Sequence, residues 1–126
     1  MHPIYPQGYR ECAENSEFAV SADLVGMIAE AAEQMMRLSG GSAVCAMTKA
    51  GTSVPGIKYA EGRWAGLREV DRAIAGGSNV DVAVRAVAAR WRKGLDTAIE
   101  RESGRDWAVY RHGGVDAVAD FADRLR

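Results

Sequence analysis

The sequence predicts a mainly α-helical protein, with about four helices around a central helical hairpin. Two observations predict it. Apolar residues recur every three or four positions over four segments, and alanine, the residue with the highest intrinsic helix propensity, is abundant. Two or three short β-strands remain open as an addition, which would make the fold α+β. With 126 residues, of which 48% are hydrophobic, we expect a single helical domain over residues 17–126.

The N-terminal part of the chain divides into an arm and a helix. Residues 1–16 contain two prolines and a glycine and show little periodicity, so we expect an extended arm. The first helix is predicted over residues 22–38, because Ser21 suits an N-cap and apolar residues follow at helical spacing. That apolar stripe consists of Leu24, Ile28, Ala31, Met35 and Leu38.

The most regular feature is a helical hairpin over residues 59–102. Helices are predicted over 59–75 and 79–102, separated by a Gly-Gly pair, with Ser78 as the N-cap of the second helix. We expect Trp64 on the inner face of the first helix. The inner stripe of the second helix is Val80, Val84, Val87, Trp91, Leu95 and Ala98. The short break makes the two helices antiparallel or crossed neighbours.

Gly62 and Gly66 lie one turn apart on a second face of the first hairpin helix. Each glycine costs a helix about 1 kcal/mol relative to alanine. Two of them at this spacing therefore indicate a close contact. A neighbouring helix is the leading interpretation and a ligand is the alternative, so both glycines are candidate interaction residues.

Two segments allow more than one structure. Residues 42–58 begin with a short apolar run, which suits a buried strand or a helical turn, and continue as a Gly- and Ser-containing loop. Residues 105–111 alternate in a way that predicts a short strand. Gly113-Gly114 is then expected to precede a terminal helix over residues 115–125.

Charge is segregated along the chain although the net charge is only −1. Residues 1–48 carry −4, residues 49–93 carry +5 and residues 94–126 carry −2. The basic segment could attract an acidic partner, or the acidic ends could fold back and neutralise it. Arginine outnumbers lysine 13 to 3, which is a compositional bias and weakens the argument for nucleic acid.

Residues 69–90 superficially resemble a helix-turn-helix. The resemblance covers about 20 residues, and its second helix would begin with Ser78-Asn79-Val80-Asp81, which includes an acidic group and lacks the Arg or Gln that would read base edges. A nucleic-acid-associated accessory protein that uses the basic region 49–93 is therefore the second hypothesis for function.

No residue pattern indicates a catalytic, metal or cofactor site, so no residue is assigned to such a role and no cofactor is expected. A small enzyme is the third hypothesis. It would require the fold to bring His112 to Cys45, with Asp106 or Asp116 orienting the histidine.

The predicted compartment is the cytoplasm. Cys12 and Cys45 lack the spacing of a metal or redox motif and are interpreted as reduced thiols. No secretory signal is expected, nor is a membrane-spanning segment or a membrane partner.

The sequence favours a small non-enzymatic protein-interaction domain, for which a homodimer is one form. Trp, Tyr and Arg are typical anchors of protein interfaces. Such residues cluster in the connector after Gly104, and with Gly62 and Gly66 they complete the candidate interaction residues: Arg105, Trp107, Tyr110 and Arg111.

Overall fold

The computed structural model describes residues 7–40 and 56–126 as four α-helices. These are α1 (Gln7–Ser39), α3 (Ile57–Ala75), α4 (Val80–Glu100) and α5 (Arg105–Arg124). No strand occurs within these two ranges, so the mainly α-helical prediction is confirmed. The apolar run and loop over residues 42–55 lie outside the described residues.

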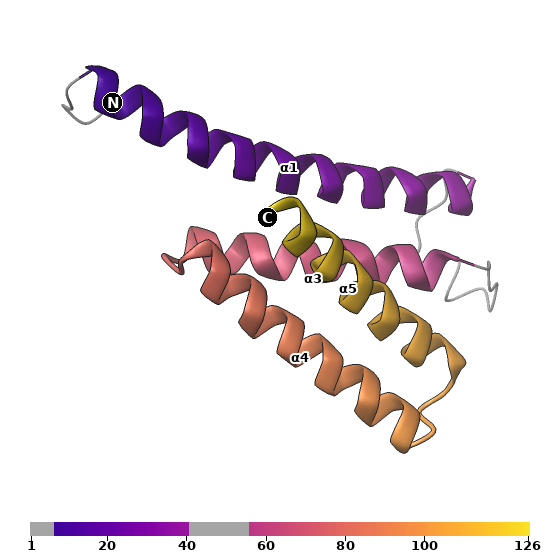
Figure 1. Ribbon diagram of the computed structural model, residues 1–126. Coiled ribbons are helices and arrows are strands. Elements are labelled where there is room, and N and C mark those ends of the chain that lie inside the picture. Colours follow the sequence, from indigo (N-terminus) through magenta and orange to yellow (C-terminus); the bar gives the residue numbers. More distant parts are fainter. Residues whose placement is uncertain (1–6, 41–55) are drawn as a thin grey trace.

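Helix α3 is the central element of the fold (Figure 1). It contacts α1 on one side and α4 and α5 on the other, and its most extensive contact is with α5. Helix α5 crosses α3 and also packs on α4. The N-terminal end of α1 runs past the ends of the other helices (Figure 1).

Helix α1 begins much earlier than the sequence analysis expected. Residues 7–16, predicted to be an extended arm, belong to the helix. Both prolines of this region precede Gln7, where a proline is compatible with the start of a helix. Three glutamates and two alanines, which favour helix, follow between Tyr9 and Val20 and offset part of the cost of Gly8.

The predicted hairpin of α3 and α4 is confirmed, with a defined turn. The amide of Ser78 donates to the Ala73 carbonyl (3.0 Å) and that of Gly77 to the Ile74 carbonyl (3.0 Å). This is a Schellman motif, and Gly77 supplies its positive φ of 105°. The N-cap of α4 is Asn79 instead of Ser78, because the Asn79 side chain accepts the amide hydrogen of Asp81 at 2.9 Å.

The C-terminal part departs most from expectation. Residues 105–111, predicted as a short strand, form the first turns of α5, and Gly113-Gly114 lies inside this helix. Both glycines are buried. A Cβ at Gly113 would overlap the Tyr59 carbonyl, and one at Gly114 would overlap the Trp91 ring. Close packing therefore stabilises a helix through a glycine pair that would break it in isolation.

The hydrophobic core lies where α3, α4 and α5 meet. Its fully buried large side chains are Trp91, Phe121, Leu67, Val70, Val87 and Val118. The predicted inner stripe of α4 is buried except for Val80, which is partly exposed. Trp64 is also only partly buried, and the Arg68 guanidinium lies 5.2 Å from the centre of its ring. Its expected place in the core is therefore wrong.

Candidate functional site

The candidate site begins at the first turn of α5. Glu102 adopts a positive φ of 51° and Gly104 one of 106°, and the Ser103 amide donates to the Ala98 carbonyl. This turn reverses the chain after α4, so that α5 starts at Arg105. Trp107, in the first turn, is 54% exposed and is one of the few large apolar side chains on the described surface.

Trp107 is held in a cluster of stacked side chains. The Tyr110 ring lies edge-on to Trp107 at 5.4 Å and is 5.2 Å from the Trp91 ring. The Arg111 guanidinium lies 4.9 Å from the Trp91 ring centre and 5.8 Å from those of both Trp107 and Tyr110. Such cation–π and edge-to-face contacts fix the side chains in place. We call Arg105, Trp107, Tyr110 and Arg111 the Trp107 patch.

A hollow lies on each side of Trp107. The hollow towards α3 has a volume of about 490 Å³ and a balanced set of charges, which are Lys58, Glu61, Arg105 and Asp106. The hollow between α4 and α5 has a volume of about 440 Å³ and is here called the α4–α5 groove. The groove is more basic, and its charged lining consists of Glu69, Arg90, Lys93 and Arg111.

Four of the six candidate interaction residues therefore lie together at the start of α5. Tyr110 and Arg111 lie three and four positions after Trp107, so a helix places all three side chains on one face. A strand would turn Tyr110 to the opposite face from Trp107 and Arg111. The sequence analysis missed Lys93 and Gly94 of α4. A Cβ at Gly94 would lie only 3.0 Å from the Arg111 guanidinium, so this glycine makes room for the arginine. Only the packing of α4 on α5 reveals that role.

The other two candidates, Gly62 and Gly66, lie away from the patch surface. Both are buried in the contact between α3 and α5. A Cβ at Gly62 would overlap the Tyr110 carbonyl, and one at Gly66 would lie 3.0 Å from the Gly114 Cα atom. The interpretation of close helix packing is confirmed. The two glycines do not form an exposed interaction surface, because α5 of the same chain covers their face.

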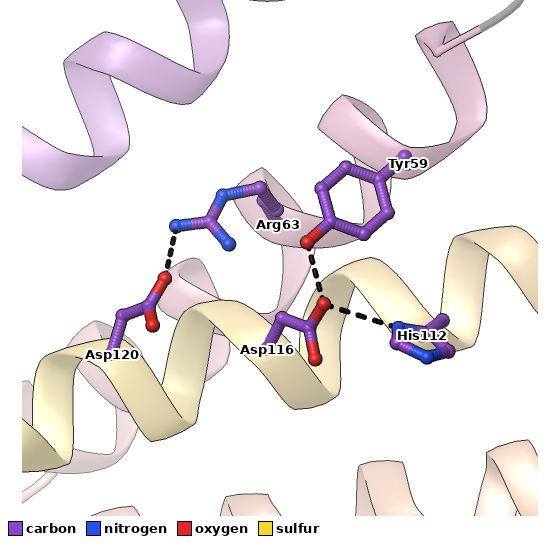
Figure 2. Close-up of polar contacts among 5 residues, drawn as sticks. All are labelled: Tyr59, Arg63, His112, Asp116 and Asp120. Carbon is purple, nitrogen blue, oxygen red and sulfur yellow. Dashed lines mark hydrogen bonds and ion pairs between the residues drawn. The ribbon is translucent and has the colours of Figure 1, made fainter.

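A polar network joins α3 to α5 beside this contact (Figure 2). The Tyr59 hydroxyl donates to Asp116 Oδ2 at 2.5 Å, and His112 Nδ1 lies 3.1 Å from the same oxygen. Arg63 donates to Asp120 Oδ2 at 2.8 Å. Of the two acids expected to orient His112, Asp116 does so.

The network bears only partly on the hypothesis of a small enzyme. His112 is exposed, and its contact with Asp116 is of the common i,i+4 type within one helix. Cys45, the proposed nucleophile, lies outside the described residues.

The basic middle of the chain is partly neutralised by contacts of its own. Arg63 pairs with Asp120 of the acidic C-terminal part, as expected if the ends fold back. Arg90 of α4 pairs with Glu69 of α3 at 3.2 Å, within the basic segment itself. Both pairs are partly solvated and contribute little to stability, but they reduce the positive charge available to a partner.

Removing the Tyr59 hydroxyl is expected to destabilise the fold and change its response to alkali. Burial, followed by the hydrogen bond to Asp116, raises the pKa of Tyr59 above 10.0. The neutral phenol is thus the stabilising form. Its contribution is complete below pH 10 and disappears as the pH rises through the raised pKa. Tyr59→Phe should lower the free energy of unfolding by about 1 kcal/mol at neutral pH.

Urea titrations at neutral pH and above pH 10 would measure both effects. The difference between Tyr59→Phe and the unmodified chain should shrink in alkali, since the unmodified chain then loses the same hydrogen bond. A difference that stays constant across this range would contradict the assignment.

The described part of the chain shows neither a metal-binding cluster nor a membrane-spanning helix. Among the residues whose side chains the structure describes, no group of three His, Cys, Asp or Glu could hold a metal ion. None of the helices in residues 7–40 and 56–126 combines the length and apolar character that crossing a membrane requires.

Fold and surface together define a small chain whose described part consists of helices and short turns, with an aromatic and arginine-rich patch between two open hollows. No protein-family model matches the sequence, and no curated protein or solved structure matches it either.

Proposed function

We propose that the chain is a small protein-interaction domain and that the Trp107 patch is its contact surface. The observation that carries this proposal is the exposure of Trp107, 54%, on a side chain that nevertheless has an edge-to-face contact with Tyr110 and a cation–π contact with Arg111. Tryptophan, tyrosine and arginine dominate the binding energy of protein interfaces. The patch presents all three on adjacent turns of one helix.

The geometry also keeps the cost of binding low. Trp107 is stacked before a partner arrives, so little side-chain entropy remains to be lost on association. The hollows beside it can accept side chains of a partner. A second copy of the chain is one partner that could use this surface.

The nucleic-acid hypothesis has weaker support. Exposed cations such as Arg85 and Arg92 follow α4, but acidic residues flank them at Asp81, Asp96 and Glu100. Affinity for a phosphate backbone grows with the number of cations that contact it, and the pairing of Arg90 with Glu69 lowers that number here. The observations therefore favour a protein partner.

Truncating Trp107 is the direct test. Random peptides displayed on phage would be selected on the unmodified chain, and the affinity of the selected peptides would be measured by fluorescence anisotropy. Trp107→Ala should weaken their binding about 30-fold, the size of an interface hot spot of about 2 kcal/mol.

Ile99→Ala is the control, since Ile99 is another exposed apolar side chain, 61% accessible on α4. It should leave the affinity within about twofold. The same variants examined by light scattering over a concentration series would show whether a second copy is the partner. Equal affinities for the two variants would remove the Trp107 patch as the contact surface.

A further inference from the structure

We infer that the α4–α5 groove binds an acidic segment of a partner protein. Arg111 and Lys93 bind a carboxylate of this segment. This inference rests on the proposed function and names the chemistry of the partner. It starts from Arg111, whose guanidinium lies 4.9–5.8 Å from the centres of three aromatic rings. Within the described residues, no carboxylate lies in ion-pair contact with it.

The Arg111 guanidinium lies beside three aromatic rings, which shield part of it from water. Its N–H donors form no ion pair with a described carboxylate and are therefore available to a ligand. A guanidinium fork matches the two oxygens of a carboxylate, and partial desolvation strengthens such a pair. Gly94 has no side chain and so leaves the space beside it to the Arg111 side chain.

The charge of the groove agrees with this ligand. Among the described residues of its lining, Arg90 is one of three cations and is paired with Glu69, the only acid among them. Arg111 and the exposed Lys93 are the remaining positive charges. Trp107 forms part of the same wall and offers an apolar surface to a neighbouring side chain of the segment.

A short acidic peptide fits this groove better than a nucleic acid. Two available cations can satisfy one or two carboxylates, whereas a nucleic acid needs a longer row of phosphate contacts. Beyond the groove, the hollow on the other side of Trp107 contains Glu61 and Asp106 beside Lys58 and Arg105. Those acids would repel a continuing phosphate backbone.

The peptides selected on the unmodified chain provide the test. We expect them to be enriched in Asp or Glu next to a large apolar residue. Arg111→Gln should weaken a selected, fluorescein-labelled peptide about tenfold, because a desolvated ion pair is lost. Arg92→Gln removes the same charge from an exposed site of α4 outside the groove and should change the affinity less than twofold.

Gly94→Ala separates the position of Arg111 from its charge. The added methyl group would displace the Arg111 side chain while leaving the net charge unchanged. This variant should also weaken the peptide, and circular dichroism should show an intact helical fold. If the affinity depended on net charge alone, Gly94→Ala would bind the peptide as tightly as the unmodified chain. That result would overturn the assignment of the groove.

The remaining outcomes separate this inference from the proposed function. Peptides without acidic residues that lose affinity in Trp107→Ala but not in Arg111→Gln would overturn the acidic ligand and retain the Trp107 patch. Peptides that bind both variants as tightly as the unmodified chain would overturn both. Selection of no peptide also counts against the inference. A single-stranded oligonucleotide that binds in an Arg111-dependent manner would assign the groove to phosphate instead.

Discussion

Replacing Gly62 by alanine is expected to lower the free energy of unfolding by about 3 kcal/mol, at the upper end of the cost of overpacking. The added methyl group would overlap the carbonyl oxygen and carbon of Tyr110. Both are backbone atoms in the interior of α5, so no side-chain rotation can relieve the overlap. The two helices must separate, and the contact around Gly113 and Gly114 opens with them.

Urea denaturation followed by circular dichroism would measure this loss, with Gly26→Ala as the control. Gly26 lies on α1, and a Cβ there would meet nothing within 4 Å. The control should therefore gain about 1 kcal/mol from helix propensity alone. If Gly62→Ala were stabilised to the same extent, the close approach of α3 and α5 would be contradicted.

Trp91→Ala is expected to cost about 3–5 kcal/mol. The Trp91 side chain is only 2% exposed and lies against Gly114 of α5, with the Tyr110 ring beside it. Its removal leaves a cavity that backbone atoms cannot fill without moving α4 relative to α5. The same change removes the ring on which Arg111 is stacked most closely.

The comparison with Trp107→Ala makes this prediction specific. Trp107 has the same side chain but is 54% exposed, so its truncation should cost less than about 1 kcal/mol. Thermal or urea unfolding of both variants would give the difference. Two equal losses of stability would show that the inner face of α4 has been assigned wrongly.

The glycine contact and the Trp107 patch are physically connected. Gly114 lets the Trp91 ring approach the backbone of α5. Because Trp91 belongs to α4, this approach also brings Gly94 and Lys93 alongside Arg111. The α4–α5 groove therefore depends on a glycine that does not itself line it.

Helix periodicity and helix-end residues predicted those helices for which both lie within one continuous stretch of sequence. The stripe from Val84 to Ala98 has the period of a helix, and it is the buried face of α4. Gly76-Gly77 ends α3 because a left-handed residue closes its last turn. The residues of the Trp107 patch were also identified, since the side-chain types that anchor interfaces stand close together in the sequence.

Local rules were wrong where packing opposes intrinsic propensity. Gly113-Gly114 indicated a break and the alternation over residues 105–111 indicated a short strand, although α5 runs through both. A glycine destabilises a helix by about 1 kcal/mol, and that cost is offset when the missing side chain allows two helices to touch. Nothing in the neighbouring sequence reports the presence of the second helix.

The sequence by itself thus determined the helical class and the hairpin of α3 and α4, and it places aromatic and arginine side chains close together after Gly104. The tertiary structure alone decided that Gly62 and Gly66 face α5 instead of a partner, and that Lys93 and Gly94 stand beside Arg111. The physical reason is the separation along the chain over which each effect acts. Propensity and periodicity act over a few turns of one chain segment, whereas a close approach depends on the shapes of two surfaces distant in sequence.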